Sequence, residues 1–192
     1  MTIDRSNPRI PEVEVDGIFV DRWSPRAFDS TPLSDDQVQA LFEAARWAPS
    51  CFNDQPWLFR YALSEEERAR FLPALVEKNR QWAQHAPLLL FVLARKQFSA
   101  NGNSNRHAAF DAGAAWMSLA LQARRLGLYA HGMAGFSVEK ALEILKVDPE
   151  EYEVMAAVAV GRRDGSEMLS EDMAKVEHPN TRKPLSEVAH RG

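Results

Sequence analysis

Residues 88–93 read Leu-Leu-Leu-Phe-Val-Leu, a continuous apolar run that directly follows Ala86-Pro87. A strand with one face in water alternates apolar and polar residues, so this uninterrupted run predicts a strand buried on both faces. A second such run covers Val154 to Val160 and ends at Gly161. Strands buried on both faces need a covering layer on each side, which favours a layered domain.

The segments around these two strands carry helix signals. Ser34 with Gln37, and Ser64 with Glu67, form capping boxes that begin helices. We expect helices over 33–48, 64–80, 106–126 and 137–145, a short strand over 57–63 and an extended stretch over 128–136. Gly127 is a plausible residue to end the longest helix. Helices that alternate with strands predict an α+β or α/β fold.

Composition limits the function classes. Of 192 residues, 45% are hydrophobic and 26% are charged, which is typical of one globular domain and excludes a disordered or collagen-like chain. The net charge of −4 argues against a nucleic-acid partner. The longest apolar run, residues 86–94, is shorter than the roughly 20 residues that a membrane-spanning helix needs. Residues 1–9 lack a hydrophobic signal core, so we expect a cytoplasmic protein without a membrane partner.

We divide the chain into an N-terminal arm (1–20), a main domain (21–164) and a C-terminal extension (165–192). Cys51 is the only cysteine, so no intrachain disulfide can form. Cys51 is either an inert packed residue or, less simply, a nucleophile. The five histidines show no metal-ligand spacing, so we expect no metal.

Residues 22–26 read Arg-Trp-Ser-Pro-Arg. In an extended segment, Arg22, Ser24 and Arg26 point to one side. Two guanidinium groups and a hydroxyl suit a phosphate, although a solvated surface turn explains the same residues. Further on, residues 49–57 (Pro-Ser-Cys-Phe-Asn-Asp-Gln-Pro-Trp) offer a hydroxyl, amides and backbone donors in one loop. That loop suits a polar ring edge or a polyol, and also suits an ordinary turn.

Gly132-Met133-Ala134-Gly135 would let the backbone approach a flat ligand, or would simply end a strand. The sequence lacks a Gly-x-Gly-x-x-Gly motif, a Walker lysine motif and a Gly-x-Ser-x-Gly elbow, which disfavours a resident dinucleotide in a Rossmann fold. Aromatic character makes a further set of residues candidates for the wall of a substrate pocket. These are Phe52, Trp82, His107, Phe110 and His131.

In this order along the chain, the segments resemble the FMN-dependent nitroreductase family. The resemblance is carried by Arg22-x-Ser24-x-Arg26, by Ala44-Ala45-Arg46-Trp47-Ala48-Pro49-Ser50 with Asn53-x-Gln55-Pro56-Trp57, by Ala86-Pro87, by Asp111-x-Gly113-Ala114-Ala115, by Leu126-Gly127-Leu128 with Gly132-x-x-Gly135-Phe136, and by Arg182-Lys183-Pro184-Leu185-Ser186-Glu187-Val188. It implies an α+β, three-layer fold with a central mixed β-sheet flanked by helices, in an intertwined homodimer with two FMN sites.

The resemblance also implies roles for residues. Arg22, Ser24 and Arg26 of one chain, with Arg182, would hold the FMN phosphate, and the other chain would bring Ser50, Asn53 and Gln55 to the ribityl chain or ring. The full expected cofactor-binding set is Arg22, Trp23, Ser24, Arg26, Pro49, Ser50, Cys51, Asn53, Gln55, Asn79, Gly132, Met133, Ala134, Gly135 and Arg182. A backbone N–H near Ala134 and Gly135 would face flavin N5. Many relatives have Pro-x-Glu-Gly where this chain has Gly132-Met133-Ala134-Gly135. The chain therefore lacks the glutamate carboxylate that could contact a substrate or the nicotinamide at this point.

The function implied is an FMN-dependent NAD(P)H oxidoreductase that reduces nitroaromatics, quinones or similar flat, electron-poor small molecules by ping-pong hydride transfer. The hydride is carried by the flavin, so no side chain is expected to be catalytic. Three alternatives remain open: a flavin-destroying or dehalogenating enzyme on the same scaffold, a flavin-binding protein without turnover, and a thiol enzyme that uses Cys51.

Overall fold

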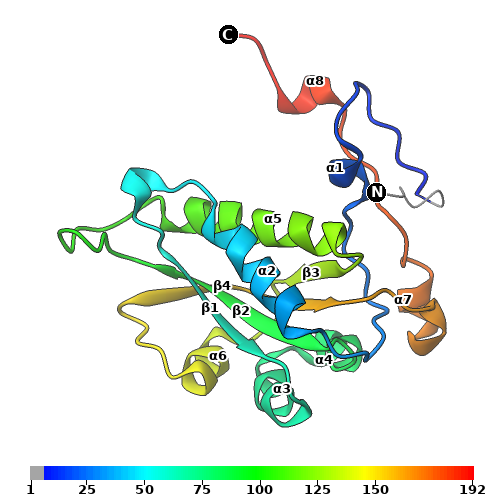
Figure 1. The fold of residues 1–192 in the computed structure, drawn as a ribbon, viewed down its shortest axis with the longest axis horizontal. Helices are drawn as coiled ribbons and strands as arrows, with labels where there is room; N and C mark the ends of the chain where they lie inside the picture. The colour runs from blue at the N-terminus through cyan, green and yellow to red at the C-terminus, as the bar shows by residue number, and fades with distance from the viewer. Residues whose placement is uncertain (1–6) are drawn as a thin grey trace.

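Four strands build one sheet in the order β1-β2-β4-β3 (Figure 1). They are β1 (Trp57–Ala62), β2 (Leu88–Arg95), β3 (Tyr129–Met133) and β4 (Tyr152–Gly161). The structure is a computed structural model that describes residues 7–192. Within this part of the chain all three strand pairings are antiparallel. The mixed sheet implied by the family resemblance is therefore not found within one described chain.

The apolar run at residues 88–93 forms the second strand of this sheet and is buried on both faces, as predicted. Because side chains alternate along a strand, the run supplies two separate hydrophobic clusters. Leu88 and Leu90 belong to the cluster on one face, and Leu89 and Phe91 belong to the cluster on the other. The second apolar strand, β4, lies beside β2, and its side chains also belong alternately to the two clusters.

Helices cover both faces, so the three-layer α+β arrangement is confirmed (Figure 1). One layer contains α2 (Asp35–Arg46) and α5 (Ala108–Arg125), and the other contains α3 (Glu65–Phe71), α4 (Glu77–Ala83) and α6 (Val138–Leu145). The capping boxes at Ser34 and Ser64 are both formed, and Gly127 follows α5 with a φ of 76°. These local signals acted as the sequence predicts.

One helix prediction is wrong. The single helix expected over 64–80 is two helices, α3 and α4, separated by the short 3-10 turn η2 (Leu72–Ala74). Pro73 is the physical reason, since proline lacks the N–H that a continuing α-helix uses and its ring clashes with the preceding turn. The break allows Leu75 to leave the helix and form a bridge with Phe136.

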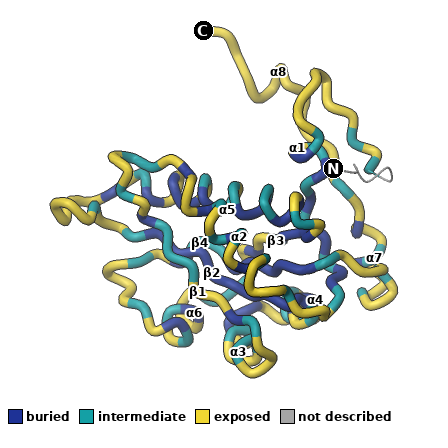
Figure 2. Tube along the Cα trace, in the orientation of Figure 1, coloured by how far each residue is buried: buried dark blue, intermediate teal, exposed yellow. Residues whose placement is uncertain are grey.

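The arm and the last part of the C-terminal extension lie side by side and project from one end of the layered body, whereas the part of the extension with α7 packs against the body (Figure 1). They carry the short helices α1 (Gly17–Asp21), η3 (Ser166–Met168), α7 (Glu171–Ala174) and α8 (Leu185–Val188). Most of this projection is exposed, as the yellow tube in Figure 2 shows. The first six residues of the predicted arm lie outside the described residues. Among residues 7–192, no helix has both the length and the apolar character that crossing a membrane needs.

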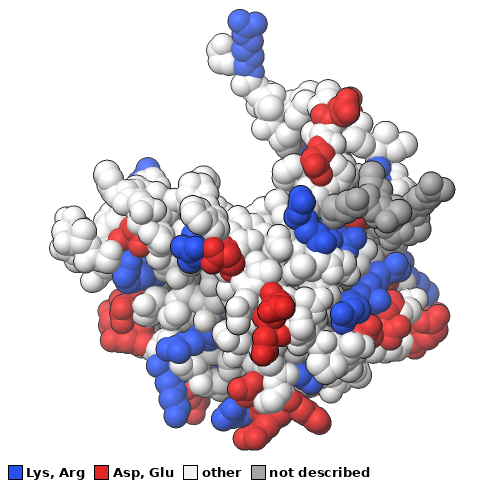
Figure 3. All heavy atoms as spheres, in the orientation of Figure 1, with Lys and Arg blue, Asp and Glu red and all other residues white. Residues whose placement is uncertain are grey.

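Charges of both signs are interspersed over the face drawn in Figure 3. A buried ion pair fixes α1 to the last turn of α5. Arg124 Nη2 lies 2.6 Å from Asp21 Oδ2, and both side chains are almost fully buried. Arg124 also donates to the Leu128 carbonyl oxygen and stacks over the Tyr129 ring. This ion pair places the segment that follows α1 beside the end of α5.

Candidate functional site

The segment 22–26 alternates between buried and partly exposed residues, as an extended segment on a protein surface should. Trp23 is only 4% exposed, with its ring 5.9 Å from that of Tyr129. Arg22, Ser24 and Arg26 share the outer side, as predicted. The Trp23 side chain belongs to the hydrophobic core, so only the Trp23 backbone could make the expected contact with the cofactor.

Arg26 already has a carboxylate partner in the C-terminal extension. Its backbone N–H donates to Glu177 Oε1 at 2.6 Å, and the N–H of Ala27 donates to the same oxygen at 2.9 Å. The Arg26 guanidinium lies 3.8 Å from the other oxygen of this buried carboxylate. Glu177 thus holds the 22–26 segment in place, and Arg26 has less uncompensated positive charge to offer an anion than the sequence implies.

Arg22 and Arg182 are different, because neither forms an ion pair within residues 7–192. Arg22 Nη1 lies 3.5 Å from Ser24 Oγ, and Arg182 donates only to backbone oxygens of the tail. Burial lowers the pKa of Arg22, and the nearby charge of Arg182 lowers it further. Two guanidinium groups that repel each other beside a hydroxyl form a ready site for an anion such as a phosphate.

Trp82 does not line an open pocket, which corrects its predicted role, whereas His131 is partly buried beside it and its predicted pocket contact stays a prediction. Trp82 is 2% exposed, and its ring stacks with Phe28 and lies 4.6 Å from the His131 ring. His131 Nδ1 lies 2.8 Å from the Pro25 carbonyl oxygen. Burial lowers the pKa of His131 to about 4, and the charge of Arg26 contributes. The neutral imidazole therefore donates to Pro25 and supports the 22–26 segment from β3.

The glycine-rich stretch after β3 presents free backbone donors. Among the described residues, the N–H groups of Ala134 and Gly135 have no hydrogen-bond acceptor. The Gly135 carbonyl oxygen, by contrast, accepts from Asn79 Nδ2 at 3.0 Å and from the Val76 N–H at 3.1 Å. A Cβ at Gly135 would lie 2.6 Å from Asn79 Nδ2, so glycine is needed for this close approach. Asn79 positions this stretch, and its predicted contact with a cofactor stays a prediction.

Two residues that were expected around this stretch take different positions. The Met133 side chain is buried in the core and Gly132 is exposed, with room for a Cβ limited by the Trp116 ring at 3.3 Å. Only the backbone of Met133 is therefore available to a ligand. The unpaired N–H groups of Ala134 and Gly135 are suited to bind an acceptor atom at the edge of a flat ring.

The loop 49–55 has an unusual backbone. Phe52, Asn53 and Gln55 all have φ values between 50° and 54°, which non-glycine residues adopt at a cost of about 1 kcal/mol or more each. Hydrogen bonds hold this geometry: Ser50 Oγ accepts from the Gln55 N–H at 3.0 Å, and Asp111 Oδ2 accepts from the Cys51 N–H at 3.0 Å. Strained backbone of this kind clusters at binding sites.

Asp54 ties the same loop to the connection between β2 and α5. One carboxylate oxygen accepts from the Ser99 N–H and hydroxyl at 2.9 and 2.6 Å, and the other lies 3.1 Å from Arg95 Nη2. Burial opposes ionisation of Asp54, but the hydrogen bonds from Ser99 and the charge of Arg95 lower its pKa overall. Asp54 therefore stays ionised and the loop stays anchored.

The aromatic residues near this loop are largely open to solvent. Phe52 is 90% exposed and Phe110 is 79% exposed, while His107 is partly buried at the start of α5. Pro49 is exposed and Cys51 is partly buried beside them. Along the outer side of α5, Gly113 and Met117 continue this exposed surface. Phe52, Phe110, Gly113 and Met117 are called the outer α5 surface below.

The predicted site residues fall into two groups that one chain does not bring together. The Cys51 N–H donates a hydrogen bond to Asp111 in the first turn of α5. Arg124 in the last turn of α5 donates a hydrogen bond to Asp21. Thirteen residues of α-helix separate these anchors, which is about 20 Å along the axis. Figure 1 shows the loop 49–55 and helix α1 at opposite ends of α5.

Sequence reasoning missed several residues that build these groups: Arg9, Asp54, Asp111 and Glu177. Asp111 was visible as part of a motif, but its partner, Cys51, lies 60 positions away. Arg9 and Glu177 reach residues 171 and 150 positions away, so no local pattern marks them.

Comparisons with known proteins identify the family to which the chain belongs. The sequence pattern of the nitroreductase family matches residues 20–81 and 74–162. A Streptomyces coelicolor protein, provisionally named as an NADH dehydrogenase/NAD(P)H nitroreductase, is 33% identical over 98 residues. That match covers 51% of this chain and 48% of the relative, so the alignment spans about half of each.

Two solved structures share the fold. A crystal structure described as an oxidoreductase containing FMN is 41% identical, covers 100% of this chain and 98% of its own, and has a TM-score of 0.91. A provisionally assigned nitroreductase from Exiguobacterium sibiricum, solved in complex with FMN, is 20% identical, with coverage of 91% and 95% and a TM-score of 0.75. Pattern, sequence and fold agree: the chain belongs to the nitroreductase family.

Proposed function

We propose that this protein is an FMN-dependent NAD(P)H oxidoreductase that reduces flat, electron-poor small molecules such as nitroaromatics and quinones. The observation that carries the proposal is the pair of guanidinium groups of Arg22 and Arg182, which have no carboxylate partner within residues 7–192. Arg22 lies beside Ser24, and the charge of Arg182 acts on Arg22. A phosphate dianion would relieve their mutual repulsion and accept their hydrogen bonds. Family membership and the FMN present in the relative of 41% identity support this assignment.

The residues present fit the rest of FMN as well. The unpaired N–H groups of Ala134 and Gly135 suit the N5 edge of the flavin ring, and they need no particular side chain. When bound, FMN would supply the redox chemistry, taking a hydride from NADH or NADPH and delivering it to the acceptor. The chain's own part is to hold the phosphate, to present two backbone donors and to keep the ring face open.

We further propose that each site is shared by two chains in a homodimer. The loop 49–55 and the 22–26 segment sit at opposite ends of α5 within one chain, so a second copy is a simple way to unite them around one cofactor. The outer α5 surface is apolar and exposed, which suits burial against another copy. Ser50, Asn53 and Gln55 would then reach the ribityl chain or ring held mainly by the partner chain.

The test begins with purified protein. We expect a yellow preparation with one FMN per chain, and rapid loss of flavin colour when NADH or NADPH is mixed in without oxygen. Reoxidation by a quinone or a nitroaromatic should follow, with the product identified to separate this reaction from flavin destruction or dehalogenation. A protein that holds FMN but is not reduced by either nucleotide would be a storage module, and one that refuses FMN would contradict the proposal entirely. Full activity of Cys51→Ala would exclude a thiol enzyme.

A further inference from the structure

We propose that Arg9, in the N-terminal arm, is a positioning residue for the phosphate subsite. Its guanidinium fastens the tail segment that carries Arg182 to the segment that carries Arg22. The two unpaired guanidinium groups are thereby held as one anion site. This inference rests on the proposed function, since it assigns a role in holding the FMN phosphate.

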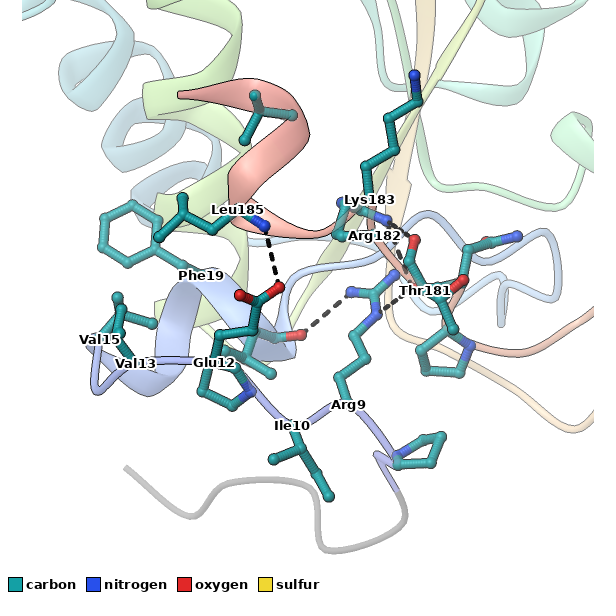
Figure 4. Close-up of a pocket in the computed structure, with 16 residues that line it drawn as sticks. Arg9, Ile10, Glu12, Val13, Val15, Phe19, Thr181, Arg182, Lys183 and Leu185 are labelled. Atoms are coloured by element: carbon teal, nitrogen blue, oxygen red, sulfur yellow. Dashed lines mark hydrogen bonds between the residues drawn. The ribbon is translucent and has the colours of Figure 1, made fainter. Parts of the chain in front are cut away.

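The hydrogen bonds of Arg9 join three places in the chain. Its Nε donates to the Asn180 carbonyl oxygen at 2.7 Å, and its Nη1 donates to the carbonyl oxygens of Val20 at 3.1 Å and Arg22 at 2.8 Å. Figure 4 shows the Arg9 side chain lying between the arm and the tail. One side chain therefore links residue 22 to a point two residues before Arg182.

The shape of arginine explains why this position suits it. A guanidinium presents several N–H groups in a rigid plane, so it can donate to separate carbonyl oxygens at once. Lysine carries the same charge as a single compact group and lacks that planar fork. The Arg9 backbone is also held in place, because its N–H donates to Asn7 Oδ1 at 3.1 Å.

A second contact keeps the arm and the tail parallel. Glu12 Oε1 accepts from the Leu185 N–H at 2.9 Å, which is drawn in Figure 4. Between the two segments lies a groove of about 540 Å³ whose walls include the apolar side chains of Val13, Phe19 and Leu185. Arm and tail thus form one unit, with Arg9 at the end nearest to Arg22.

Charge gives independent support. Burial lowers the pKa of Arg9, and the charges of Arg182 and Arg22 lower it further, while Asp21 acts in the opposite direction. Arg9 is thus near both other guanidinium groups, and all of its described hydrogen bonds from the guanidinium go to neutral carbonyl oxygens. Three neighbouring cations that form no ion pair among residues 7–192 favour binding of a multiply charged anion.

The test compares FMN with riboflavin, which lacks the phosphate. We expect Arg9→Ala to weaken FMN binding to the apoprotein by about tenfold or more, and riboflavin binding by less than twofold. Arg9→Lys should lose nearly as much FMN affinity, because it keeps the charge but not the fork. The melting temperature of each variant should stay close to that of the wild type, since Arg9 lies outside both hydrophobic clusters.

A double-mutant cycle separates positioning from direct contact. If Arg9 acts by placing Arg182, then Arg9→Ala in an Arg182→Ala background should change FMN affinity by less than twofold. Lys183→Ala is the matched control, because this neighbouring cation pairs with Glu187 and points away from Arg9 in Figure 4. It should leave FMN affinity within twofold of the wild type.

Distinct outcomes overturn the inference. Equal loss of FMN and riboflavin affinity in Arg9→Ala, full rescue by Arg9→Lys, additive effects of Arg9 and Arg182, or an equal loss in Lys183→Ala would each show that Arg9 does not position the phosphate site. A wild-type apoprotein that binds neither FMN nor riboflavin would instead refute the proposed function. The two failures are therefore distinguishable in one set of titrations.

Discussion

At the residue scale, His131 links the phosphate segment to the sheet. It donates to the Pro25 carbonyl oxygen from β3, and its ring packs on Trp82. Burial disfavours the protonated ring and the nearby charge of Arg26 disfavours it further, so the pKa of His131 falls to about 4. The imidazole thus serves here as a neutral hydrogen-bond donor, and not as a proton carrier.

This gives a prediction for stability against pH. In the unfolded chain His131 takes up a proton near its ordinary value of 6.5, whereas in the folded chain it does so only near pH 4. Between these values the unfolded state binds more protons, so the free energy of unfolding falls as the pH falls. The contribution of His131 is complete above about pH 6.5, and about 3 kcal/mol is lost by about pH 4.

Urea unfolding at several pH values between about 4 and 7 measures this loss. His131→Gln keeps an amide donor but cannot titrate, so its stability curve should be flatter than that of the wild type. His178→Gln, at an exposed position in the tail, is the control and should run parallel to the wild type. Parallel curves for His131→Gln and the wild type would contradict this account of the pKa.

At the scale of elements, capping determines where helices begin. Ser34 Oγ accepts from the Gln37 N–H at 3.2 Å, and Gln37 Oε1 accepts from the Ser34 N–H at 3.0 Å. Ser170 also stands at the N-cap position of a helix, α7, but its side chain makes no capping hydrogen bond. The same residue type at the same position therefore differs in what it contributes.

We expect Ser34→Ala to lower the free energy of unfolding by about 1 kcal/mol, because the Gln37 N–H in the first turn of α2 loses its acceptor, Ser34 Oγ. Ser170→Ala should change it by only a few tenths of a kcal/mol. Chemical denaturation of both variants under the same conditions makes the comparison. Equal effects at the two positions would show that the capping box does not stabilise α2.

These elements also show what local sequence can predict. The apolar run at 88–93 and the box at Ser34 depend on neighbours within a few residues, and both predictions are confirmed. Pro73 is an equally local signal, and the prediction of one helix from Ser64 to residue 80 is wrong because proline ends such a helix. The alternation at 22–26 correctly placed three side chains on one side of that segment.

At the scale of the whole molecule, the candidate site depends on contacts that no local pattern encodes. Glu177 takes up the charge expected to be free on Arg26, and Arg9 joins segments more than a hundred positions apart. Trp82 is predicted as a pocket residue but lies in the core, because aromatic character does not distinguish a core position from a surface one. Only packing separates the two, and packing is a property of the complete fold.

The shared site gives the last prediction, which concerns the outer α5 surface. Phe110 is 79% exposed in the first turn of α5, beside the anchor of the loop 49–55. Phe110→Glu places a charge on the surface proposed for the second copy, where burial of an unpaired carboxylate is costly. The substitution suits the isolated chain, because an acidic residue is favourable in the first turn of a helix.

We therefore expect Phe110→Glu to shift the protein from about twice the chain mass of 21.7 kDa to a single chain in light scattering, with a melting transition retained. FMN affinity should fall at least tenfold, because the Ser50 loop and the Arg22 segment of one chain stay at opposite ends of α5. Val138→Glu is the matched control: Val138 is 50% exposed in the first turn of α6, in the opposite layer, and its variant should remain a dimer that binds FMN. A Phe110→Glu protein that remains dimeric, or a monomer with undiminished FMN affinity, would contradict a site shared across the outer α5 surface.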